Sequence, residues 1–238
     1  MVMEMTEFKT FKLGDLFEFK AIKQAKSQKM IPMKDDGIPY VVQSQANNMV
    51  SRYVDKDWLI KHNEPPVKGN CLVLGVTLPA VSYQPYEFGA SQVITARCSF
   101  LNERIGLYFV TLLRKQMKLF SYTHKPGMER YKKLKIELPI NSQTNKINFK
   151  YIEDRVKALE QDRVKALANY LTVTGLDNYQ LTEKNKQILR YKPIKPGSRE
   201  IDFDYIEEYI KAIQKITIKD VVKYKDKVIN KTKDVIKK

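Results

Sequence analysis

The sequence has few of the residues from which disulfide frameworks and metal sites are built. Its 238 residues include only two cysteines and two histidines. Cys71 and Cys98 both lie in apolar segments, so we expect two buried, reduced thiols rather than a metal site, which would need more cysteine or histidine nearby. Nine glycines and ten prolines are too few for a collagen-like or low-complexity chain.

Long hydrophobic runs are also missing. The longest apolar stretch, residues 71–80, is far shorter than the roughly 20 residues that cross a bilayer. Residues 1–11 contain no apolar core of signal-peptide length. Neither a phosphate-binding loop nor a dinucleotide-binding glycine motif is present. We therefore expect a cytoplasmic protein that has no catalytic residues, no metal and no cofactor of its own.

Positive charge is what the sequence has in excess. The 43 Lys+Arg residues outnumber the 27 Asp+Glu residues and give a formal net charge of +16. Such a surplus indicates a polyanionic partner, with nucleic acid ahead of an anionic membrane, because basic groups release counterions when they meet phosphates. Hydrophobic residues make up 43% of the chain, enough to form an ordinary core.

The patterns divide the chain into an α+β part and a helical part. Residues 1–145 carry short strand-like runs, such as 71–76 and 135–140, and helical spacing of apolar residues from Phe100 to Phe120. We predict a globular α+β domain with a mixed or antiparallel sheet. Long helices that form a coiled-coil-like assembly arm are predicted to follow it. The predicted segments of this arm are a first helix at 146–175, a connector at 176–200 that includes one short helix, and a second helix at 201–238.

The two predicted long helices begin with similar sequences. Residues 147–159 match residues 201–213 at seven of thirteen positions, including tyrosine, glutamate and lysine as well as apolar residues. Asn148 and Asp202 are the expected N-caps, and Gly175 is the expected end of the first helix. Duplication explains the shared polar positions better than chance similarity between amphipathic helices does.

Three segments carry candidate nucleic-acid contacts. Residues 111–135 contain eight basic residues and one acid, a net charge of +7, interleaved with aromatic residues. Residues 43–52 contain the amides that read adenine, and Arg52 suits guanine. Residues 83–92 are predicted to place polar groups on loops between strands. The alternative interpretations are a solvated basic face for the first segment and ordinary polar loops for the others. The candidate DNA-binding residues are Gln43, Asn47, Asn48, Arg52, Tyr83, Gln84, Gln92, Tyr122, Lys125, Arg130, Lys132 and Lys133.

Several segments, in this order, resemble target-recognition domains of Type I restriction–modification DNA specificity subunits, most closely a Type IIB-like branch. They are the segments 11–17 (FKLGDLF), 69–75 (GNCLVLG), 84–88 (QPYEF), 128–139 (MERYKKLKIELP), 153–171 and 173–179 (VTGLDNY), with 201–229 similar to the second conserved helix. Such subunits usually carry two recognition domains, each followed by a helix. Here a second domain is not seen between the helices, which predicts a half-subunit with one recognition domain.

The resemblance implies a non-catalytic subunit that recognises double-stranded DNA and docks methyltransferase and, where one exists, restriction subunits. S-adenosylmethionine is then expected in the partner methyltransferase. Two copies are expected to form a homodimer through the helices and to read a split, palindromic site. Candidate positions for helix packing or partner docking, with an ordinary intrachain core as the equal alternative, are Ile152, Val156, Leu159, Ile206, Ile210 and Ile213.

Two other functions stay open on the sequence alone. One is a decoy or inhibitory partner that occupies the modification subunits without useful DNA affinity of its own. The other is a stand-alone metal-dependent nuclease, because paired acids and a lysine occur by chance in any chain this charged.

Overall fold

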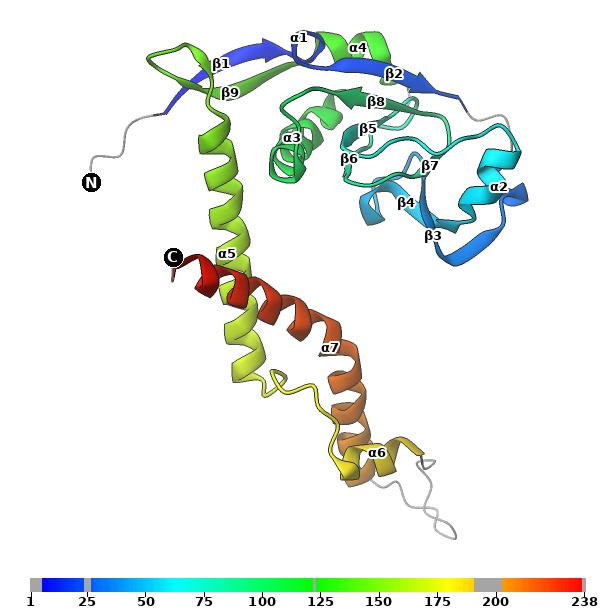
Figure 1. Ribbon diagram of the computed structural model, residues 1–238, viewed down its shortest axis with the longest axis vertical. Coiled ribbons are helices and arrows are strands. Elements are labelled where there is room, and N and C mark those ends of the chain that lie inside the picture. The colour runs from blue at the N-terminus through cyan, green and yellow to red at the C-terminus, as the bar shows by residue number, and fades with distance from the viewer. Residues whose placement is uncertain (1–5, 24–26, 122, 191–202, 237–238) are drawn as a thin grey trace. The chain divides into compact units, whose positions relative to one another are not determined.

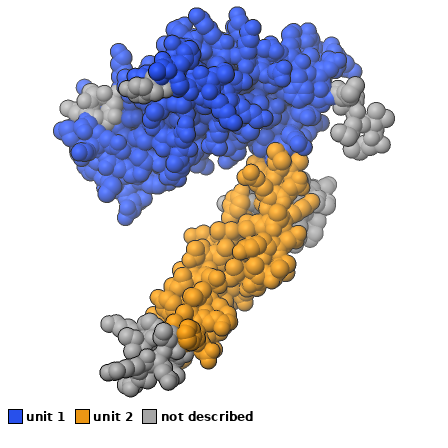
Figure 2. All heavy atoms as spheres, turned by 180° about the vertical axis from the view of Figure 1, so that it is seen from behind, with its two compact units in different colours: residues 1–157 blue, residues 158–238 orange. Residues whose placement is uncertain are grey.

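The computed structural model describes residues 6–23, 27–121, 123–190 and 203–236, with side chains in the last helix followed to residue 226. The chain divides into two compact units, Met1–Lys157 and Ala158–Lys238 (Figure 2). Unit 1 therefore reaches beyond the 1–145 domain drawn from the sequence and includes the first turns of the following helix. The predicted α+β class with subsequent long helices is confirmed.

Unit 1 contains three small sheets, built mostly from antiparallel pairs (Figure 1). The first sheet has the order β1 (Glu7–Lys12), β9 (Lys135–Asn141), β10 (Lys146–Ile147). The second has the order β2 (Glu18–Ile22), β8 (Val93–Arg97), β5 (Cys71–Gly75), β6 (Val81–Gln84). The third has the order β4 (Val50–Val54), β3 (Met33–Val41), β7 (Gly89–Ala90), and its β3–β7 pair is parallel.

Short helices connect these strands. They are α1 (Leu13–Leu16), α2 (Lys56–Lys61), α3 (Glu103–Gln116), α4 (Met128–Lys133) and the 3₁₀ turns Gln28–Met30, Asn47–Met49 and Met117–Leu119. Asn102 caps α3 because its side-chain oxygen accepts from the Ile105 amide at 3.0 Å. Gly106 lets this helix approach β6, since a Cβ there would lie 2.4 Å from the Tyr83 ring.

The second sheet has a core on each face, as its alternating side chains require. Leu72 and Leu74 of β5 belong to the larger core, which also holds the buried face of α3. Cys71 and Val73 point to the opposite core, beneath β3 and β7. The larger core continues into the long helix that follows, because Ile152 is fully buried in it.

Both cysteines are free thiols, Cys71 buried and Cys98 partly buried. Burial raises the pKa of each thiol to about 11. They therefore behave as the small apolar residues that the sequence predicts, because the reactive thiolate is a minor species near neutral pH.

The long helices begin and end close to the predicted positions. Their bounds are α5 (Phe149–Val173), α6 (Glu183–Arg190) and α7 (Phe203–Ile236). Asn148 caps α5 through its side-chain oxygen, which accepts from the Tyr151 amide at 3.0 Å. Gly175 ends the helix in the left-handed region at φ +67°. The predicted cap Asp202 lies outside the described residues.

Within unit 2, α6 packs on α7. The Tyr205 hydroxyl donates to the Ile188 carbonyl at 2.7 Å, and the Lys215 ammonium donates to Asn185 Oδ1 at 3.1 Å. Ala212 and Val222 are buried on α7. The α6 helix lies in the connector, where the sequence predicted one short helix, and polar contacts hold it to α7.

The continuation of the unit 1 core into α5 can be tested with two substitutions on one helix. Ile152→Ala removes a fully buried side chain and should lower the unfolding free energy of unit 1 by about 3 kcal/mol. Leu159→Ala, at a position 49% exposed, should cost less than about 1 kcal/mol. Urea unfolding monitored by Trp58, the only tryptophan, reports on this unit. Equal costs for the two variants would contradict the packing described.

Candidate nucleic-acid interface

Residues 43–49, between β3 and β4, form an amide-rich segment that is held in an unusual backbone conformation. Asn47, Asn48 and Met49 have φ values of +47°, +50° and +67°, in the left-handed region. Asparagine tolerates this region, and Met49 is anchored there by complete burial. The Asn48 side-chain amide donates to the Tyr83 carbonyl at 3.0 Å, and Gln84 donates to the Asn48 carbonyl at 2.8 Å.

Two glutamines of the same segment bind the turn between β5 and β6, residues 76–79. Gln43 Oε1 accepts from the Thr77 amide at 2.7 Å, the Thr77 hydroxyl at 3.0 Å and the Leu78 amide at 3.1 Å. The Gln45 amide donates to the Pro79 carbonyl at 3.0 Å. The side-chain oxygen of Gln43, a predicted base contact, and the side-chain amide of Gln45 are therefore used to hold this turn.

Tyr83 and Gln84 are not on a loop between strands, which corrects the sequence interpretation. Both lie in β6 and are buried, because α3 packs on one side of this strand and the Asn47–Met49 turn lies on the other. The Tyr83 hydroxyl donates to Asn70 Oδ1 at 2.9 Å. Their role as DNA contacts stays a prediction. In the structure, both residues form hydrogen bonds with Asn48 of the amide-rich segment.

Arg52 and Gln92 flank the amide-rich segment. The Arg52 guanidinium donates to the Gln28 carbonyl, and its buried Nε makes no hydrogen bond within the described residues. Gln92 is exposed just before β8. Its neighbour Ser91 donates from its amide to the Val41 carbonyl at 2.9 Å, which places Gln92 beside the end of β3.

The basic segment consists of α4 and the loop that precedes it. Lys125, Arg130 and Lys133 are exposed, and the Arg130 guanidinium donates to the Lys125 carbonyl. Lys132 is half-buried and pairs with Glu129 at 2.8 Å, a hydrogen bond that lowers the pKa of that carboxyl group. Tyr122 lies outside the described residues. Lys133, which the sequence predicts as a phosphate contact, is therefore exposed, and the contact itself stays a prediction.

One buried hydrogen bond joins the basic segment to the end of β5, which the amide-rich segment also approaches. The hydroxyl of Tyr131, between the exposed cations of α4, donates to the Gly75 carbonyl at 2.8 Å. Gly75 ends β5 immediately before the turn that Gln43 holds. Both predicted segments therefore contact residues 75–79, the basic one through Tyr131 and the amide-rich one through Gln43. Sequence reasoning missed this turn, because only the long-range contacts bring both segments to it.

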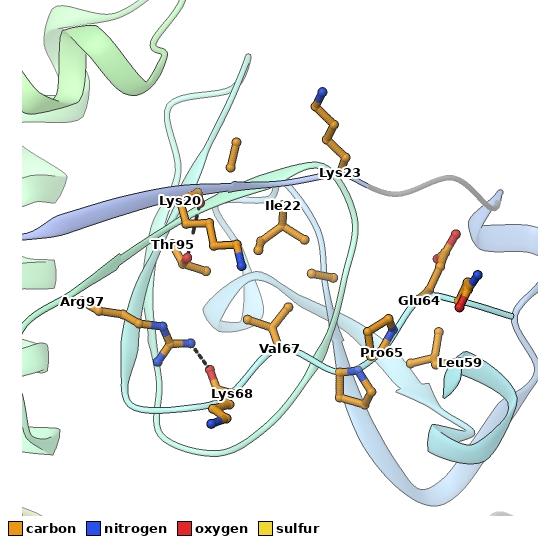
Figure 3. A pocket seen from close by; sticks show the side chains of 14 residues that line it. Lys20, Ile22, Lys23, Leu59, Glu64, Pro65, Val67, Lys68, Thr95 and Arg97 are labelled. Carbon is orange, nitrogen blue, oxygen red and sulfur yellow. Dashed lines mark hydrogen bonds between the residues drawn. The ribbon is translucent and has the colours of Figure 1, made fainter. Parts of the chain in front are cut away.

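A separate pocket of about 470 Å³ lies beside the exposed edge of β2 (Figure 3). Lys20 reaches into it, while the Arg97 guanidinium is turned to the backbone and donates to the Lys68 carbonyl (Figure 3). The same guanidinium donates to the Gly69 carbonyl at 2.6 Å. The opposite wall is apolar and includes Pro65 and Val67. None of the predicted DNA contacts lines this pocket, so it is distinct from the surface around the turn.

The described residues contain no group of three or more metal-ligating side chains. Over the same part of the chain, no helix combines the length and the apolar character needed to cross a membrane. The described fold is an α+β domain that continues into a long helix. It carries exposed cations on α4 and in the loop before it, and amide side chains between β3 and β4, which are side-chain types that contact DNA phosphates and bases.

A family model described as the Type I restriction modification DNA specificity domain matches residues 5–169. Because the match spans more than half of the chain, this protein belongs to that family. The matched range includes all described residues of unit 1 and most of α5. A search of curated proteins gives no match.

Three solved structures are similar to the chain at low sequence identity. The S subunit of a Type I restriction–modification system from M. genitalium has a TM-score of 0.46 and 13% identity, covering 79% of this chain and 47% of that one. The HsdS subunit from Thermoanaerobacter tengcongensis has a TM-score of 0.43 and 10% identity, covering 65% and 38%. A third structure, whose title concerns complex assembly and conformational transition of the type I R-M system, has a TM-score of 0.46 and 13% identity. That match covers 70% of this chain and 41% of the other. This chain spans less than half the length of each.

The exposed cations should contribute to DNA affinity in a salt-dependent way. Lys133→Ala should weaken binding to all DNA sequences alike and reduce the slope of log K against log salt by about 0.9, the value for one lost phosphate contact. Fluorescence anisotropy at several salt concentrations measures this slope. The control is Lys219→Ala, an exposed lysine of α7. Identical slopes for the wild type and Lys133→Ala would remove Lys133 from the interface.

Proposed function

We propose that this chain recognises DNA sequence as the specificity component of a Type I restriction–modification system. The observation that carries the proposal is the family match across residues 5–169, the part of the chain in which the structure gathers the amide-rich segment and the exposed cations. The cations bind phosphates and set the orientation on the duplex, while the amides and the turn between them face base edges.

The chain itself performs no bond chemistry under this proposal. Its partners in the cytoplasm are double-stranded DNA and the methyltransferase subunits, with a restriction subunit where the system has one. Transfer of the methyl group belongs to the methyltransferase, which holds S-adenosylmethionine. Membership of a DNA specificity family supports this division of labour.

We infer further that two copies pair through their helices. On α7 the residues Phe203, Ile210, Ile213 and Tyr224 are 72%, 50%, 40% and 60% exposed, and Ile206 is half-buried. The four from Phe203 to Ile213 follow three- and four-residue spacing, and Tyr224 lies about three helical turns further along the same stripe, while Ala212 and Val222 are buried on another side. An apolar stripe of this length is covered in stable assemblies, and a second α7 offers a self-complementary surface.

The candidate packing residues of α5 behave differently from one another. Ile152 is in the core of unit 1, Val156 is half-buried, and Leu159 is 49% exposed. Ile152 therefore serves intrachain packing, which was the alternative that the sequence left open. Leu159 and the stripe on α7 are the residues available for pairing.

The sequence-recognition proposal is tested by mapping methylated sites in DNA modified by this chain together with its methyltransferase. We expect one split motif, symmetric if two copies pair, and no site-specific methylation by the methyltransferase alone. Binding to the methyltransferase without any specific DNA site would indicate the decoy function instead. Metal-dependent cleavage by the purified chain would reject the proposal.

The pairing proposal is tested separately by sedimentation equilibrium. Ile213→Glu places a charge in the middle of the apolar stripe and should convert a dimer into a monomer with unchanged helix content by circular dichroism. The control is Lys223→Glu, a charge change at an exposed position outside the stripe. A dimer that tolerates Ile213→Glu, or a wild-type chain that is monomeric at all concentrations, would contradict this inference.

A further inference from the structure

The turn between β5 and β6 presents an apolar side chain at the centre of the candidate interface. Leu78 is 52% exposed, although several hydrogen bonds hold the turn that carries it. Gln43 accepts three of them, and Gln45 donates another to the Pro79 carbonyl. The Gly75 amide also donates to the Ala80 carbonyl across the base of the turn, at 3.0 Å.

The turn is too tight for any residue but glycine at its base. A Cβ on Gly75 would lie 2.0 Å from the Leu78 carbonyl oxygen, a distance that no packing adjustment of a side chain could relieve. The chain therefore fixes the position of Leu78 through both its backbone and its partners. A fixed side chain loses little conformational entropy when it meets a ligand.

The position of the turn indicates what Leu78 meets. The helix α4, which carries the exposed cations, contacts the base of the turn through Tyr131 and Gly75, and the amide-rich segment contacts the turn itself through Gln43 and Thr77. A duplex gripped by these two clusters would bring its groove to the turn. The apolar group that a base pair presents in the major groove is the 5-methyl group of thymine.

We propose that Leu78 contacts a thymine 5-methyl group in the target site and is a specificity-determining residue. Gln43 is a positioning residue in this scheme, because it acts on the DNA through the turn rather than by pairing with a base. The inference rests on the proposed DNA-recognition function and assigns one element of it.

The test compares thymine with deoxyuridine, which lacks only the methyl group, at each thymine of the mapped target site. Binding is measured with the chain in complex with its methyltransferase. We expect one thymine per half-site at which removal of the methyl group weakens wild-type binding about fourfold, the effect of losing one methyl contact. Leu78→Ala should weaken binding to thymine DNA by at least a similar factor and show no further loss with deoxyuridine at that position.

Two further variants distinguish this role from general destabilisation. Leu107→Ala, which truncates a leucine on α3 that is 41% exposed, should keep the wild-type response to deoxyuridine. Gln43→Ala should lose that response at the same thymine, while Gln43→Glu, which retains the acceptor oxygens, should keep it. The expected loss of the deoxyuridine response is therefore confined to one thymine. A change in folding stability alone would weaken binding without depending on that one base.

Three results would overturn the inference while leaving the proposed function intact. They are a target site without thymine, a wild-type response at no thymine, and an unchanged thymine-to-deoxyuridine ratio in Leu78→Ala. If Leu78→Ala weakened binding to every sequence without any methyl dependence, Leu78 would be a wedge between base steps and not a methyl reader. The absence of any sequence-specific methylation would instead reject the proposed function itself.

Discussion

The hydrogen bond from the Tyr131 hydroxyl to the Gly75 carbonyl connects the two halves of the candidate interface. Tyr131 is fully buried, and its burial raises the pKa of the phenol, so it stays a neutral donor under physiological conditions. The carbonyl it satisfies lies at the end of a central strand, where an unpaired buried acceptor costs roughly 1–3 kcal/mol. This contact fixes α4, which carries the exposed cations, against the end of β5, directly before the turn at residues 76–79.

The amide side chains show how one set of residues serves both folding and recognition. Gln43, Asn48 and Gln84 use their polar atoms to bind neighbouring backbone groups. Those bonds hold three consecutive left-handed residues, a conformation that persists only where the surroundings determine it. Held in this way, the amide-rich segment presents its exposed groups in one arrangement. A preorganised surface favours discrimination between DNA sequences over equal binding to all of them.

Sequence patterns predicted the elements whose signals are local. The apolar spacing of α3 and α5, the cap at Asn148 and the end at Gly175 each depend on residues a few positions apart, and each is found in the structure. Strand β6 was misread because its polar residues are buried by contacts with α3 and with the Asn47–Met49 turn, which no local pattern records. Leu78 was missed for a related reason. Only the contacts of Gln43 and Tyr131 bring the two segments that the sequence did identify to its turn.

The internal repeat shows that two similar helix sequences can differ in how deeply their matching residues are buried. Phe149 opens α5 and packs on Phe100 with a ring-centroid distance of 4.6 Å, next to the buried Ile152. Their counterparts in the second copy, Phe203 and Ile206, open α7 with the phenylalanine 72% exposed and the isoleucine half-buried. Both copies keep the apolar residues that start the helix, but within the described residues only the first copy buries its isoleucine in a core. The counterparts in the second copy belong to the exposed stripe of α7 through which two chains are proposed to pair, so the duplication and the stripe concern the same helix face.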